Sequence, residues 1–357
     1  MERGPFVLLE FDYKKIAGSY LRANSPRGRP EMHKFDDPQY QFDMDLIKEK
    51  SERNKNWGKW GPDDEVGSLN YLTTDQVLAG VKCIVSGKTF TLQIQMGNPS
   101  GDPVWPGRSG AKRHNVMDRG FYLGGAGVVF PGGMEYADDV MTIYNQGSSQ
   151  YDALGHVWYG DHIYNGYPAE TTTGGLKKAS VLPIAERGVV GRGILIDIAR
   201  YRGKAVLDRG ETFDHNDLVA AAKAQGTEIQ KRDVLLIHTG FIGSFYHTPR
   251  DEFYTDFIEP GLTFSPELVQ WFYEMEIPNL VTDTIANEVT TDPVSGVVLP
   301  LHSALMCNLG VAFTEILALD ELAADCAADG QYTFLYTAAP LKIVEGTGAP
   351  VNPIVIK

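Results

Sequence analysis

Two short, continuously apolar runs separated by an amphipathic segment dominate the middle of the chain. The runs cover residues 193–198 and 233–238, and residues 214–225 between them carry apolar side chains at helical spacing. Unbroken apolar runs of this length are typical of strands buried on both faces of a parallel sheet. The pattern therefore predicts a strand–helix–strand unit and, with it, an α/β fold.

Alternation and capping signals predict further elements. Residues 89–96 alternate between polar and apolar side chains, which indicates a strand with one solvated face. Ser265 followed by Pro266 predicts the start of a helix that runs to about residue 276. Residues 97–107 are dense in Gly and Pro and should form a loop. Other predicted helices cover 75–86 and 315–328, with a helix or apolar turn at 302–310, and other predicted strands cover 140–144, 279–283 and a terminal pair at 332–336 and 341–345.

The organisation of the chain is that of one large domain behind an N-terminal arm. Residues 1–50 are rich in charge, Pro and Asn and have weak periodicity, so we expect an extended arm that makes subunit contacts. Residues 51–357 contain neither an internal repeat nor a low-complexity linker, which favours a single continuous domain.

Composition narrows the possible partners. The formal net charge of −14 argues against nucleic acid, whose binders use clustered Lys and Arg. No run approaches the roughly 18 apolar residues of a membrane helix, and the N-terminus lacks the basic region and cleavage site of a signal peptide. Cys83, Cys307 and Cys326 lie far apart, as expected for reduced, packed thiols in a cytoplasmic protein.

Several familiar motifs are absent, and one segment remains. The Gly-rich stretches lack the strand–glycine–helix context of a nucleotide site, and there is no GxSxG elbow or HExxH pair. The segment from Gln146 to His156 is different. Gln150 and Asp152 are two residues apart and share a face on an extended strand, while Asp152 and His156 offer a carboxylate for a metal and an imidazole for proton transfer.

This segment resembles the signature of the cyclase superfamily, which includes bacterial kynurenine formamidase and isatin hydrolase. That signature reads His-x-Gly-Thr-His-x-Asp-x-Pro-x-His, and Asp152 and His156 fall on its Asp and last His. The segment 300–315 is similar to the second metal segment of the family, with His302 and Glu315 on its ligand positions. Similar segments also occur at 56–70, 193–202, 233–240 and 260–262, so the resemblance covers roughly residues 56–345.

The resemblance implies a swivelling β/β/α fold, an oligomer such as a homodimer or homotetramer, and metal-dependent hydrolysis of an amide or lactam-like bond. It implies that His156 is the general base and acid and that Asp152, His302 and Glu315 hold the metal. Trp60 and Trp158 lie in family-like segments and are candidates for substrate binding, together with Gln146 and Ser149.

The sequence departs from the signature at two of its three histidines. Gln146 and Gln150 replace the first two, and a glutamine offers only a neutral carbonyl oxygen where the family has imidazole. Two carboxylates neutralise one divalent ion but not two. We therefore expect one ion held by Asp152, His302, Glu315 and Gln150, with manganese or magnesium favoured over zinc by the oxygen-rich ligands.

Two alternatives remain open at this point. Loss of both histidines is compatible with a metal-free lyase, dehydratase or ring-opening enzyme in which His156 and Asp152 act directly, assisted by Glu288. A binding protein without catalytic activity is the other alternative, although Asp152, His156, His302 and Glu315 all persist together.

Overall fold

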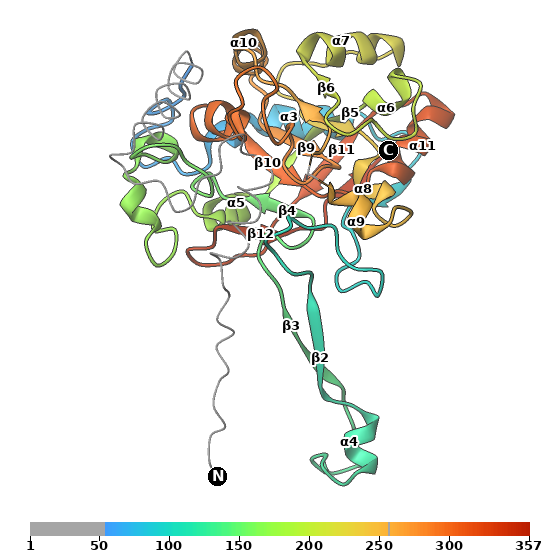
Figure 1. The fold of residues 1–357 in the computed structure, drawn as a ribbon. Coiled ribbons are helices and arrows are strands. Elements are labelled where there is room, and N and C mark those ends of the chain that lie inside the picture. The colour runs from blue at the N-terminus through green and yellow to red at the C-terminus, as the bar shows by residue number, and fades with distance from the viewer. Residues whose placement is uncertain (1–53, 256–257) are drawn as a thin grey trace.

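The computed structural model describes residues 54–255 and 258–357, and a mixed sheet forms its centre (Figure 1). The predicted arm at residues 1–50 lies outside the described residues. The sheet has nine strands in the order β1-β13-β11-β5-β7-β9-β10-β4-β12. These strands are β1 (Thr89–Thr91), β4 (Gln150–Asp152), β5 (Val189–Asp197), β7 (Val234–His238), β9 (Asn279–Thr282), β10 (Ala312–Glu315), β11 (Thr333–Ala338), β12 (Gly348–Pro350) and β13 (Ile354–Ile356).

The middle of the sheet is parallel and both of its flanks are antiparallel. β5, β7, β9 and β10 run parallel to one another, whereas β11, β13 and β1 on one side and β4 and β12 on the other pair antiparallel. The predicted strand–helix–strand unit is confirmed as β5, α7 (His215–Ala224) and β7. Asp214 caps the helix, because its carboxylate accepts hydrogen bonds from the Asn216 and Asp217 N–H groups.

Helices cover the sheet, and the backbone of one of them lies very close to the backbone of a strand. α3 (Thr74–Val81) packs on β5 and β11, and a Cβ at Gly80 would lie 2.7 Å from the Gly191 carbonyl oxygen. The predicted helix after Ser265 is confirmed as α10 (Pro266–Glu274), with the Ser265 hydroxyl accepting from the Leu268 N–H. No helix among the described residues is long and apolar enough to cross a membrane.

The remaining short elements complete the described chain. The helices are α5 (Val181–Arg187), α6 (Ile198–Tyr201), α8 (Phe241–Ser244), α9 (Arg250–Phe253) and α11 (Asp320–Asp329), with 3-10 turns η1 (Gly67–Tyr71), η2 (Tyr164–Gly166) and η3 (Ala169–Thr172) and a π-helical segment η5 (His302–Cys307). β6 (Thr212–Phe213) and β8 (Gly261–Leu262) form a separate parallel pair. Cys307 and Cys326 are buried, as expected for packed thiols.

The predicted elements at the end of the chain need two corrections. Glu315 ends strand β10, and the helix predicted from that residue begins only at Asp320. Residues 341–345 form no strand, and β11 pairs instead with β5 and β13. In both cases pairing with distant strands decides the structure, and the local apolar pattern could not reveal it.

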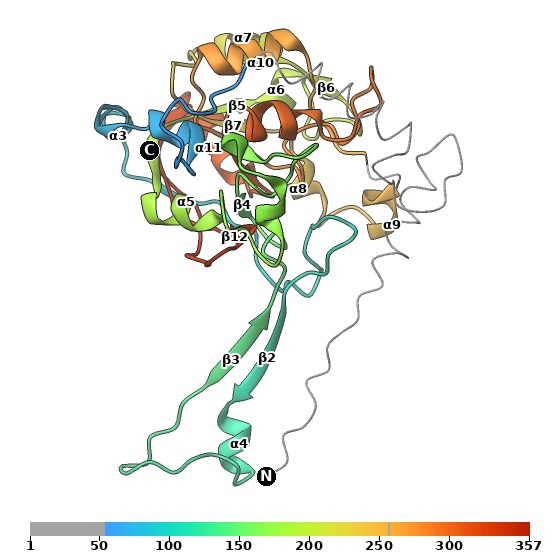
Figure 2. The same ribbon diagram turned by 90° about the vertical axis from the view of Figure 1, so that its left-hand side faces the viewer.

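A long hairpin projects from this body (Figures 1 and 2). It consists of β2 (Lys112–Met117), the short helix α4 (Arg119–Leu123) and β3 (Asp138–Thr142), and we call residues 112–142 the projecting hairpin. The strand predicted at 140–144 falls in this hairpin and does not join the central sheet. No residue of the projecting hairpin is buried.

A network of ion pairs around His238 links the carboxyl ends of the parallel strands β5 and β7. His238 at the end of β7 donates from Nδ1 to Asp197 at the end of β5 over 2.9 Å, and its Nε2 lies 3.2 Å from Asp320 and 3.8 Å from Asp283. Burial by itself lowers the pKa of His238, but hydrogen bonds with Asp197 and Asp320 and the negative charge of Asp283 outweigh it and raise the pKa to about 10.

We expect His238→Gln to destabilise the protein in a pH-dependent way. Because the folded pKa lies above the unfolded value of about 6.5, the stabilisation is complete below pH 6.5 and is lost as the pH rises towards 10. The difference in melting temperature between wild type and variant should therefore shrink over this range. Exposed His247→Gln is the matched control and should show no such trend. A difference that does not change with pH would contradict the assignment.

Candidate metal and catalytic site

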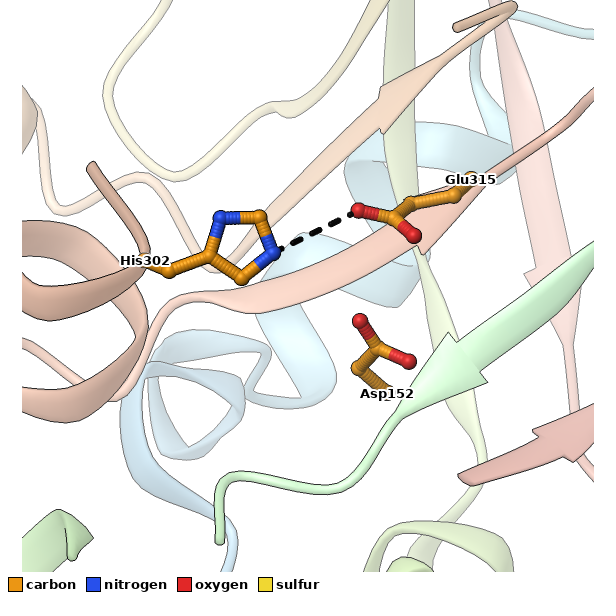
Figure 3. Close-up of side chains that lie close together, drawn as sticks. All are labelled: Asp152, His302 and Glu315. Carbon is orange, nitrogen blue, oxygen red and sulfur yellow. Dashed lines mark ion pairs between the residues drawn. The ribbon is translucent and has the colours of Figure 1, made fainter. Parts of the chain in front are cut away.

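Asp152, His302 and Glu315 form a buried cluster at the antiparallel flank of the sheet (Figure 3). Each offers one ligand atom, and these atoms all lie within 4.8 Å of one another. His302 Nε2 is 3.7 Å from Glu315 Oε1. Asp152 comes from β4, His302 from η5 and Glu315 from β10, so Asp152 meets residues that lie 150 and 163 positions further along the chain.

Strand register brings the carboxylates together. β4 and β10 pair antiparallel with Gln150 opposite Glu315 and Tyr151 opposite Thr314. Directly opposed residues point to the same face of a sheet, and so do residues two apart on one strand. Gln150, Asp152 and Glu315 therefore share a face, as the sequence predicts for the first two.

Glu288 orients His302. Its carboxylate accepts hydrogen bonds from the N–H groups of Leu301 and His302, which begin the η5 segment, and lies 2.7 Å from His302 Nδ1. With the proton of the imidazole on Nδ1, the lone pair of Nε2 is directed at Glu315 and Asp152. A carboxylate that fixes the tautomer in this way is the usual partner of a metal-binding histidine.

Strained backbone surrounds the cluster. Ile316, immediately after Glu315, has φ of 61°, and Asn287 and Leu299 have φ of 59° and 53°. A β-branched residue in this region is disfavoured and needs support from its surroundings. The Ile316 N–H donates to the Thr284 carbonyl over 2.9 Å, and the hydroxyl of Ser149 donates to the Ile316 carbonyl over 2.5 Å.

Buried oxygen atoms around the cluster lack hydrogen-bond donors. Gln150 donates from Nε2 to one oxygen of Glu315 over 2.9 Å, and Asn287 donates from Nδ2 to the other over 3.0 Å. This leaves the buried side-chain oxygens Gln150 Oε1, Asn287 Oδ1 and Asp152 Oδ1 without a hydrogen-bond partner among the described residues. Such oxygens next to a carboxylate pair and an imidazole fit a cation, which needs acceptors and no donors.

The pKa shifts of the buried groups also support a site that fits a cation. Burial, together with the charges of Asp152 and Glu259, raises the pKa of Glu315 well above its ordinary value. Burial also raises the pKa of Glu288, and it raises that of Glu259 to about 8. Burial lowers the pKa of His302 to about 4. A bound divalent ion would favour the charged carboxylates and the neutral imidazole, which are its ligand forms.

His156 lies at the edge of the cluster. Its Nε2 is 4.0 Å from Asp152 Oδ1 and its side chain is 19% exposed, so it is the member of the group that solvent reaches most easily. Burial lowers the pKa of His156 although Asp152 opposes this, and the positive charge of Arg108 lowers it further. The neutral imidazole favoured at neutral pH can accept a proton.

Of the other sequence-predicted site residues, Gln146, Ser149 and Trp60 contact other parts of the protein. Gln146 donates from Nε2 to the Thr347 hydroxyl, and Ser149 is fully buried with its hydroxyl bonded to the backbone of Ile94 and Ile316. Trp60 packs edge-on against Tyr71, with ring centroids 5.0 Å apart. Trp158 is 38% exposed. Their assignment to substrate binding stays a prediction.

Sequence reasoning missed several residues of the site. Asn287 and Glu259 were not considered, and Glu288 was considered only as an assistant in a metal-free reaction. Arg108 is half-buried and donates from Nη1 to the Gln146 carbonyl over 3.2 Å, a contact that no local sequence pattern indicates. The position of Asn287 and Glu288 shortly after the predicted strand 279–283 was the available signal, since ligands gather at the carboxyl ends of parallel strands.

The fold and the cluster together define a mixed α/β protein with a buried carboxylate–histidine site suited to a metal ion. Residues 88–289 match the family model described as putative cyclase. A crystal structure of a novel cyclase is 35% identical, covers 85% of this chain and 100% of its own, and superimposes with a TM-score of 0.78. The chain therefore belongs to the cyclase family, as its sequence segments indicated.

More distant structures share the fold. Isatin hydrolase A from Labrenzia aggregata, bound to benzyl benzoate, is 18% identical over 79% of this chain and 97% of its own, with a TM-score of 0.53. Isatin hydrolase A from Ralstonia solanacearum is 16% identical over 75% and 91%, also with a TM-score of 0.53. A comparison with curated proteins found no match.

We expect Glu288→Gln to weaken divalent-ion binding by about 10-fold to 100-fold, because the variant no longer fixes the His302 tautomer. Titration of the dialysed protein with MnCl₂ in a calorimeter measures the effect. Glu274→Gln, an exposed position on α10, is the matched control and should leave the affinity unchanged. An unchanged affinity in the Glu288 variant, with its circular dichroism intact, would refute the positioning role.

Proposed function

We propose that this protein is a metal-dependent hydrolase that cleaves an amide, lactam or lactone bond in a small molecule, with His156 as general base and acid. The observation that carries the proposal is the juxtaposition of His156 with the buried cluster of Asp152, His302 and Glu315. Membership of the cyclase family and a fold shared with isatin hydrolases support it.

Each residue has a distinct task in the proposed reaction. Asp152, His302 and Glu315 would hold the ion, and a divalent ion bound there supplies Lewis acidity towards the substrate carbonyl and water. His156 takes a proton from the attacking water as its oxygen bonds to the carbonyl carbon. It then passes the proton to the leaving nitrogen or oxygen as the bond to that atom breaks.

The ligand set favours one ion, with manganese or magnesium ahead of zinc. Asp152 and Glu315 neutralise two positive charges, and Gln150 stands where the family signature has an imidazole. The amide nitrogen of Gln150 faces Glu315, and its buried oxygen is available as a neutral fourth ligand. Oxygen ligands suit manganese and magnesium, while the single imidazole leaves zinc possible.

We expect His156→Ala to lower turnover by about 100-fold to 10,000-fold, the usual contribution of a general base, while metal content and fold stay unchanged. A panel of aryl amides, lactams and lactones assayed with Mn²⁺, Mg²⁺ and Zn²⁺ provides the measurement. His162→Gln, at an exposed histidine shortly after the segment that contains His156, is the matched control and should keep full activity.

Metal removal separates the hydrolase from a metal-free enzyme in the same experiment. Dialysis against EDTA should abolish turnover, MnCl₂ should restore it, and elemental analysis should find one ion per chain. Two tightly bound zinc ions per chain would contradict the single-ion site. Activity that survives dialysis would instead favour a lyase or ring-opening reaction by His156 and Asp152.

A further inference from the structure

We propose that the substrate carries an anionic group, most simply a carboxylate, and that Arg108 binds this group beside the metal cluster. The inference rests on the proposed hydrolase function, because it names the class of substrate on which that site acts. It concerns a side chain that lies outside the cyclase signature.

Arg108 is tied to the site segment. Its Nη1 donates to the Gln146 carbonyl over 3.2 Å, and Gln146 lies four residues before Gln150 in the segment that contains Asp152 and His156. Arg108 also lines a cleft of about 710 Å³, which has apolar walls at Val104, Pro106 and Phe245. Arg108 therefore lines the cleft and is hydrogen-bonded to the segment that contains Asp152 and His156.

Arg108 has no carboxylate partner among the residues that the structure describes. A guanidinium offers five N–H donors, and a single hydrogen bond to one carbonyl uses only one of them. The acidic residue of the cleft, Asp102, accepts instead from the N–H groups of Gly97, Asn98 and Ala111. Arg250, another cation of the cleft, donates to the carbonyls of Phe245 and Ser100.

The positive charge of Arg108 affects the titratable groups of the cluster. It lowers the pKa of His156 and His302 and opposes the increase in the pKa of Glu315. The geometry agrees, because Gln146, whose carbonyl Arg108 contacts, donates from Nε2 to the Thr347 hydroxyl, and the next residue, Gly348, pairs with Asp152. A chain with a net charge of −14 repels anions in general, so a local half-buried cation is what would select an anionic substrate.

A pair of nearly isosteric probes tests the proposal. Benzoate and benzamide differ mainly in charge, and calorimetry on the Mn²⁺-loaded protein gives their affinities without any need for turnover. Wild type should bind benzoate at least 10-fold more tightly than benzamide. Arg108→Gln should lower the affinity for benzoate by about 10-fold to 100-fold, which is the contribution of a charge-assisted hydrogen bond. It should change the affinity for benzamide by less than about 3-fold.

Matched control variants show whether the effect on benzoate affinity is specific to Arg108. Lys112→Gln removes an exposed cation of the same cleft and should change neither affinity by more than about 3-fold, the upper range of a surface charge pair. Arg108→Lys should recover part of the benzoate affinity. If Arg108→Gln leaves the preference for benzoate intact, the carboxylate binds the ion instead and the proposal is overturned.

The outcomes also separate this inference from the proposed function. Arg108-dependent binding of benzoate without turnover of any panel substrate would support the anion site and contradict the hydrolase. Turnover that is equally affected by Arg108→Gln for anionic and neutral substrates would support the hydrolase and contradict the anion site.

Discussion

The antiparallel pairing of β4 with β10 brings the candidate site together. It places Gln150 opposite Glu315 and so turns Asp152 and Glu315 to the same face. A slip of one residue would turn Asp152 towards the opposite face of the sheet. Ser149 opposes such a slip, because its hydroxyl accepts from the Ile94 N–H and donates to the Ile316 carbonyl. The residue that the sequence suggested for substrate binding thus holds the strained backbone beside a metal-ligand candidate.

The electrostatics of the cluster explain why this arrangement suits a cation. Asp152, Glu259, Glu288 and Glu315 are all buried, and buried carboxylates without positive partners are strongly destabilising when they are charged. Burial raises the pKa of Glu259, Glu288 and Glu315 accordingly. A divalent ion removes this penalty, and because it binds only the folded site, it stabilises the fold as well. The same ligands would then serve both catalysis and folding.

The sequence predicted the centre of the fold from local patterns, and the site mainly from resemblance. Apolar runs and caps located β5, α7, β7 and α10 because buried strands and capped helices leave local signals. Glu315 was placed in a helix, since nothing local shows that it pairs with Gln150 across 165 positions. Glu288 and Asn287 act through the side chains they contact, and such contacts become visible only when distant segments are brought together.

The base of the projecting hairpin adjoins the segment that carries the candidate site. β2 and β3 pair with Lys112 opposite Thr142, and continuing this register places Arg108 opposite Gln146. The hydrogen bond between the Arg108 guanidinium and the Gln146 carbonyl therefore closes the root of the hairpin. Beyond this bond the chain enters the hairpin on one side and the Asp152–His156 segment on the other. The orientation of the hairpin and that of the Arg108 guanidinium therefore depend on the same bond, which also adjoins the segment that carries the candidate site.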